Sequence, residues 1–110
     1  MEYDVILLEP AKKFLLNLKI NFRAKAFRTI GLLKEFGPIL KEPHTKKVTG
    51  TKNLYELRVK LGNNICRFFY FHHAHNIYVI TSGYVKKEQK LNKLEIKKAL
   101  GLMKLYEEEE

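Results

Sequence analysis

The sequence contains a single cysteine, Cys66, among its 110 residues. One thiol excludes a disulfide within the chain, a CxxC redox pair and a zinc site built on cysteines. Aspartate is equally rare, because Asp4 is the only one, and Glu56 is the only acid within residues 54–71. Paired carboxylates for general acid–base catalysis are therefore missing.

Signals for a bound cofactor or for export are also absent. Residues 50–52 lack the earlier glycine and the following helix of a phosphate-binding loop, and no nucleophile elbow is present. Three histidines within residues 72–75 have no Cys or acid beside them, so we expect no metal and no cofactor. The sequence opens on strand-like residues 3–8 without a basic leader, and no apolar run is long enough to span a membrane. We therefore expect a cytoplasmic protein.

Positive charge is what the sequence has in excess. Lys and Arg number 21 against 12 Asp and Glu, a formal net charge of +9. Four of the acids form the final run, so we expect a basic domain at residues 1–106 and an acidic tail at residues 107–110. The excess favours a polyanionic partner, namely nucleic acid, an anionic membrane surface or an acidic protein segment.

Residues 54–71 are typical of a β-hairpin. Both halves alternate apolar with polar residues around a Gly-Asn-Asn turn. Because side chains alternate between the two faces of a strand, Arg58 and Lys60 share the face opposite Leu57 and Val59. The sequence therefore predicts one apolar face and one charged face.

The turn sets the register of this hairpin. A two-residue or four-residue turn centred within residues 62–65 pairs Leu61 with Cys66, and a turn at Gly62-Asn63 keeps the same parity. In all these cases Arg67 joins the charged face, whereas a three-residue bulged turn would reverse the second strand and place Arg67 on the apolar face. Three cations on one face suggest a phosphate-binding surface, although edge strands also carry Lys and Arg to block aggregation.

The segments before the hairpin predict a strand, two helices and a connection. Residues 3–8 form the strand, and Asn21 is the expected N-cap of the second helix, which Gly37-Pro38 ends. The apolar positions of that helix should face the sheet; they are Phe22, Ala26, Phe27, Ile30 and Leu33. Residues 38–53 form a connection with at most a short strand at residues 47–49.

The segments after the hairpin complete an α+β domain of order β-α-α-β-β-β-α. A polar turn at residues 72–76 leads into residues 77–81, an almost continuously apolar strand that should lie inside the sheet. An amphipathic helix starts near Asn92. We expect one domain with a small, mostly antiparallel sheet, two N-terminal helices packed on it and a C-terminal helix.

The Arg, Lys and Tyr side chains suit one reaction, the attack of an RNA 2′-hydroxyl on the adjacent phosphate. The guanidinium of Arg58 or Arg67 can hold two phosphate oxygens as negative charge builds. Lys60 or Tyr84 can move protons, and Phe69 or Tyr84 can stack bases, packing being the alternative for the aromatic rings. Basic residues of the connection can extend an RNA-contacting rim or simply be solvated; they are Lys46, Lys47 and Lys52.

Taken in order, three segments resemble the RelE/HigB superfamily of toxin–antitoxin ribonucleases, in its phage-protein-like branch. The segments are Leu54-Tyr-Glu-Leu-Arg-Val-Lys60, Cys66-Arg-Phe-Phe-Tyr70 and Gly83-Tyr-Val-Lys-Lys-Glu-Gln-Lys90. The resemblance implies catalytic roles for the basic residues Arg58, Lys60, Arg67 and Lys86 or Lys87. Tyr84 substitutes for the proton-transfer residue of relatives. The expected RNA-binding residues are Lys46, Lys47, Lys52, Glu56, Phe69 and Lys90, with Glu56 as a base or a salt-bridge partner.

The resemblance also implies a function. Family members cut messenger RNA in the ribosomal A site without a metal, and a cognate antitoxin inhibits them in a hetero-oligomer. We expect an antitoxin with an acidic or amphipathic segment that covers the basic face, and no membrane partner. Two alternatives stay open, a ParE-like inhibitor of DNA gyrase with the same fold and a non-catalytic basic domain that binds RNA or a partner.

Overall fold

The computed structural model of the chain describes residues 2–85 and 92–109. Its elements are β1 (Asp4–Leu7), α1 (Glu9–Asn17), α2 (Ile20–Phe36), the 3-10 helix η1 (Gly37–Ile39), β2 (Thr45–Lys47), β3 (Tyr55–Leu61), β4 (Asn64–Ala74), β5 (Ile77–Val85) and α3 (Lys93–Glu109). Within these ranges, none of the helices has the length and apolar character needed to cross a membrane. The described part of the expected acidic tail forms the end of α3.

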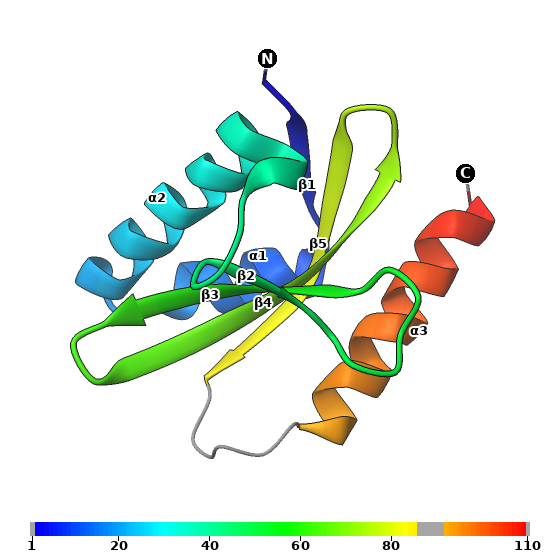
Figure 1. The fold of residues 1–110 in the computed structure, drawn as a ribbon. Coiled ribbons are helices and arrows are strands. Elements are labelled where there is room, and N and C mark those ends of the chain that lie inside the picture. Colours follow the sequence, from blue (N-terminus) through cyan, green and yellow to red (C-terminus); the bar gives the residue numbers. More distant parts are fainter. Residues whose placement is uncertain (1, 86–91, 110) are drawn as a thin grey trace.

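The five strands form one sheet in the order β1-β5-β4-β3-β2 (Figure 1). Only β1 pairs in parallel, with β5, so the sheet is mostly antiparallel and β3, β4 and β5 form the predicted meander. The strand β5 lies between two others and is buried from Tyr78 to Ser82, as its apolar sequence predicts. The predicted short strand is β2, at Thr45–Lys47 rather than residues 47–49.

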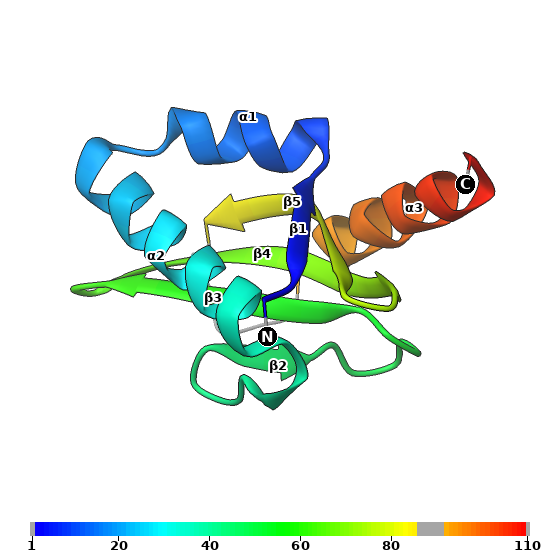
Figure 2. The ribbon, with the colours of Figure 1, turned by 90° about the horizontal axis from the view of Figure 1, so that it is seen from above.

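The helices cover both faces of the sheet. The chain reverses between α1 and α2, which lie over one face (Figure 2), whereas α3 packs on the other. The predicted N-cap at Asn21 is wrong, because Lys19 is the N-cap and its carbonyl accepts the N–H of Arg23. The predicted end is confirmed, since Gly37 terminates α2 with a φ of 54°, a conformation that favours glycine.

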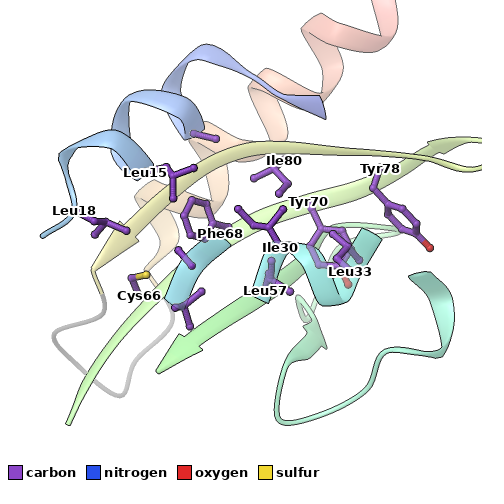
Figure 3. Packing of buried hydrophobic residues seen from close by; sticks show 13 residues of the cluster. Leu15, Leu18, Ile30, Leu33, Leu57, Cys66, Phe68, Tyr70, Tyr78 and Ile80 are labelled. Atoms are coloured by element: carbon purple, nitrogen blue, oxygen red, sulfur yellow. The ribbon is translucent and has the colours of Figure 1, made fainter. Parts of the chain in front are cut away.

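The main core lies between the sheet and the first two helices (Figure 3). Leu57, Phe68 and Ile80 project from three neighbouring strands toward Leu15 and Leu33 of the helices, and all five side chains are buried. Burial of this much apolar surface, at about 25 cal/mol per Å², is the main force that holds the helices on the sheet.

Cys66 belongs to the same core, as its place in the hairpin pattern predicts. Burial raises the pKa of its thiol to about 12, so the group stays protonated and unreactive at neutral pH.

The hairpin turn is Gly62-Asn63, which pairs Leu61 with Asn64. The alternative pairing of Leu61 with Cys66 is therefore wrong by two residues. The parity is nevertheless the predicted one, because Arg58 lies directly opposite Arg67. At the other end of β4 the strand continues to Ala74, so the polar turn predicted at residues 72–76 is shorter.

A β-bulge in β5 decides which way the end of that strand faces. Phe69 pairs with Ser82 and Tyr70 pairs with Ile80, so Thr81 is an extra residue opposite β4. Strict alternation would place Tyr84 on the same face as Tyr78 and Ile80, in the core. The bulge turns Tyr84 to the opposite face, where Arg67 pairs with it.

Gly83, which follows the bulge, should not tolerate a side chain. A Cβ atom there would lie 2.5 Å from a ring carbon of Phe14 and 3.0 Å from one of Phe68. We expect Gly83→Ala to lower the free energy of unfolding by about 1–3 kcal/mol through overpacking. Urea denaturation measures this change, with Gly101→Ala as the control, because a Cβ at Gly101 has nothing within 4 Å. Equal stability of both variants would contradict the close packing of β5 against α1.

Candidate functional site

One row of side chains crosses three strands on the face toward α3. The register aligns Arg58 of β3, Arg67 of β4 and Tyr84 of β5, which we call the arginine row. Lys60 follows Arg58 on the same face of β3, next to the hairpin turn, and is exposed. The sequence predicted this grouping from alternation alone, except for the bulge that brings Tyr84 into it.

Arg67 of the arginine row forms a buried ion pair with Glu56. Arg67 donates a hydrogen bond from Nη1 to Oε2 of Glu56, and the two residues are only 5% and 3% exposed. Arg58 also approaches this carboxylate, with its Nε 3.9 Å from the same oxygen. Two arginines directly opposite each other in a sheet repel, and the shared carboxylate offsets that repulsion. The salt-bridge role predicted for Glu56 is confirmed.

The site keeps unused capacity for an anion. The side chain of Arg58 is 30% exposed, whereas the Nε atoms of Arg58 and Arg67 are buried and have no hydrogen-bond acceptor among the described residues. Glu56 balances one of the two arginines, and the exposed Lys60 adds a further positive charge. The site therefore carries an excess of positive charge, and Arg58 and Lys60 are the members of it that an anion can reach from solvent.

The ring of Tyr84 is held in place by the ring of Phe69. Its ring stacks on Phe69 with the centroids 5.5 Å apart and 19° between the planes. Burial, with a smaller contribution from the charge of Glu56, raises the pKa of Tyr84. The phenol therefore stays neutral and able to donate a proton. Phe69 has no exposed surface, so in this conformation it supports Tyr84 and does not contact a ligand.

The structure separates the other predicted residues. Lys46 pairs with Glu56 and shares its face, whereas Lys47 pairs with Tyr55 and lies on the opposite face. Lys52 is exposed in the loop between β2 and β3. Lys86, Lys87 and Lys90 lie outside the described residues.

Two hydroxyls near the site were missed from the sequence. Ser82 pairs with Phe69 on the α3 face, and its Oγ lies 3.2 Å from Oγ1 of Thr81. Both are buried, and the Thr81 hydroxyl donates a hydrogen bond to the carbonyl of Phe69 at 3.4 Å. The two adjacent polar residues in an apolar strand were the available signal for the bulge. In the portion of the chain that the structure covers, no three His, Cys, Asp or Glu side chains are grouped to hold a metal.

Comparison with known proteins identifies the fold. The family model described as "Phage derived protein Gp49-like (DUF891)" matches residues 13–104. A free-state structure of a mutant E. coli toxin RelE is similar over 92% of this chain and 97% of that one, with 20% identity and a TM-score of 0.67. An archaeal RelE–RelB complex from Pyrococcus horikoshii matches over 80% and 99%, with 22% identity and a TM-score of 0.60.

The intact E. coli RelBE toxin–antitoxin complex is a further structural match. It covers 78% of this chain and 99% of that one, with 18% identity and a TM-score of 0.60. No curated protein matches the chain. The likeness to the solved structures, at these identities, establishes that the chain has the RelE fold.

Proposed function

The chain belongs to the phage-derived Gp49-like family, and from this premise we propose that it is the toxin of a type II toxin–antitoxin system that cuts messenger RNA on the ribosome. The RelE fold and the arginine row support this proposal. In this proposal residues 1–106 form the toxin domain, and the protein acts in the cytoplasm. Two of the similar structures are RelE–RelB complexes, which supports a cognate antitoxin as the partner.

The observation that carries the proposal is the arginine row with its buried carboxylate. In the proposed reaction the 2′-hydroxyl gives its proton to a solvent water as its oxygen attacks the adjacent phosphorus, and the bond to the 5′-oxygen breaks to leave a 2′,3′-cyclic phosphate. Negative charge grows on the phosphate oxygens, and Arg58, Arg67 and Lys60 stabilise it. The reaction needs charge stabilisation and proton transfer, both of which Arg, Lys and Tyr side chains provide.

Glu56 acts in this scheme as a positioning residue for Arg67. A buried guanidinium without a counter-ion would turn toward solvent or destabilise the fold. The bond from Nη1 to Glu56 fixes the plane of the guanidinium. Arg67 is then held in place before the RNA binds, so its buried charge acts on the phosphate from a fixed position, whereas the more exposed Arg58 and Lys60 contact the phosphate directly.

Tyr84 is the proposed donor of a proton to the leaving 5′-oxygen. We expect Tyr84→Phe to slow cleavage by about 10²-fold or more, because it removes a general acid and keeps the ring that stacks on Phe69. A raised pKa keeps the native phenol protonated through neutral pH, so the native rate should decline only at alkaline pH. Single-turnover cleavage as a function of pH measures both effects. The control is Tyr55→Phe, on the opposite face, and a native rate and pH profile in Tyr84→Phe would contradict the role.

Primer extension on a reporter messenger after brief induction tests the proposed function. Discrete cuts within translated codons, lost in Arg67→Lys, are the expected result. Growth arrest with an intact messenger and double-strand DNA breaks would instead favour a ParE-like inhibitor of DNA gyrase. Binding to ribosomes without arrest or cuts would favour a non-catalytic RNA-binding domain, and either of these results overturns the proposal.

A further inference from the structure

An apolar stripe runs along the outer side of α2. Ile20, Ala24, Phe27 and Gly31 are exposed and recur at the spacing of one helix face, with Ile20 75% and Phe27 53% exposed. Leu16, near the end of the separate helix α1, is also 55% exposed. The burial predicted for Phe27 is thus wrong, because the sheet-facing positions of α2 are Ala26, Thr29, Ile30 and Leu33. A row of exposed apolar side chains on one helix indicates a binding surface.

Positive charge borders this stripe. The helix α2 carries the cations Arg23, Lys25, Arg28 and Lys34 and the single acid Glu35. Arg28 is exposed and follows Phe27, and the exposed Lys19 precedes Ile20. A ligand that complements both features is an amphipathic helix with an apolar stripe and acidic flanks.

The opposite side of the molecule offers less apolar surface to such a helix. Val48, Leu54 and Phe69 are buried in a cluster with Ala99 of α3, so α3 already covers the apolar residues of that face. The exposed apolar residues of α3 itself are Leu94 and Leu105, and Lys98 and Gly101 lie between them along the helix face.

We propose that the α2 stripe, formed by Ile20, Ala24, Phe27 and Gly31, is the docking surface for an acidic amphipathic helix of the antitoxin. This inference rests on the proposed function, because it takes the antitoxin as the partner. It departs from the expectation that the antitoxin covers the basic face of the sheet. The helices α1 and α2 lie over one face of the sheet (Figure 2), and the arginine row lies on the opposite face, toward α3.

Binding of the purified antitoxin encoded with this protein tests the surface. The chain is prepared in the Arg67→Lys background to permit expression, and titration calorimetry compares the parent with Ile20→Ser combined with Phe27→Ser. We expect the double variant to bind about 100-fold more weakly, since buried apolar anchors dominate interface energetics. The matched control is Leu94→Ser combined with Leu105→Ser, which removes equally exposed apolar groups from α3 and should change the affinity less than 3-fold.

The contribution of the basic residues that border the stripe is measured separately. Arg28→Glu should weaken binding and reduce its dependence on salt, because a surface charge that faces the acidic flank is reversed. Circular dichroism of every variant shows whether it folds, and exposed positions are expected to leave the spectrum unchanged.

The outcomes separate this inference from the proposed function. Parent-like affinity of a folded Ile20→Ser, Phe27→Ser variant overturns the α2 surface while the toxin–antitoxin pairing stands. Weaker binding of the α3 control places the partner on α3 and also overturns the inference. Absence of any binding to the parent overturns the pairing itself. Sedimentation of the free chain shows whether it forms dimers. Dimers of the parent that are lost in the double variant would make the stripe a contact between two copies of the chain, and this would also overturn the inference.

Discussion

Replacing Glu56 with alanine should lower the free energy of unfolding by about 3–5 kcal/mol, because it leaves the guanidinium of Arg67 buried without a counter-ion. Arg67 is 5% exposed, so solvent cannot replace the lost carboxylate without a rearrangement of the sheet. Arg58 makes the loss larger, since its repulsion with Arg67 would then be unopposed. Guanidinium chloride denaturation followed by circular dichroism measures the change.

Two further variants separate the charge from the volume of the pair. Glu56→Met combined with Arg67→Met removes both charges and fills similar space, and it should regain most of the stability lost in Glu56→Ala. Glu35→Ala, which removes an exposed acid from α2, should change stability by less than about 0.5 kcal/mol. A Glu56→Ala protein as stable as the parent would mean that Arg67 does not depend on this carboxylate.

Replacing Arg67 with lysine should slow RNA cleavage by about 10²–10³-fold while the fold persists. Lysine keeps the positive charge beside Glu56, so the buried pair is retained. Its compact ammonium concentrates that charge beside Glu56, whereas the planar guanidinium spreads the charge over three nitrogens toward the proposed phosphate position. Single-turnover cleavage on programmed ribosomes, with thermal unfolding measured in parallel, checks both parts of the expectation.

The two neighbouring lysines of β2 provide an internal control for this experiment. Lys46 shares the face of Glu56, and Lys47 lies on the other face of the sheet. We expect Lys46→Ala to weaken cleavage modestly and Lys47→Ala to leave it unchanged, although both lysines were predicted to contact RNA. Cleavage by Arg67→Lys at the native rate would remove Arg67 from the proposed site.

In the proposed site, stability and RNA cleavage would depend on the same side chain. Arg67 holds part of the sheet together through Glu56 and also belongs to the proposed phosphate site. An alanine at this position would mix loss of chemistry with loss of folding. Arg67→Lys and the double variant Glu56→Met, Arg67→Met separate the loss of chemistry from the loss of folding, which is why they are the informative variants.

Local chemistry in the sequence determined much of this protein. Alternation within residues 55–60 fixed which side chains share a face, and the even-length turn at Gly62-Asn63 brought Arg67 opposite Arg58. Glycine at position 37 ended α2, and Asn92 begins α3 by accepting the N–H of Glu95 through its side chain at 3.1 Å. Each of these features depends on residues a few positions apart, so the sequence contains all the information needed.

Contacts between distant segments decided the rest. The burial of Glu56 and Arg67 requires three paired strands. The bulge at Thr81, which turns Tyr84 out of the core, arises from the pairing of Phe69 with Ser82 and of Tyr70 with Ile80. The exposure of Phe27 depends on which side of α2 meets the sheet. Period-two and helical patterns do not encode these choices, because they follow from the packing free energy of the whole domain.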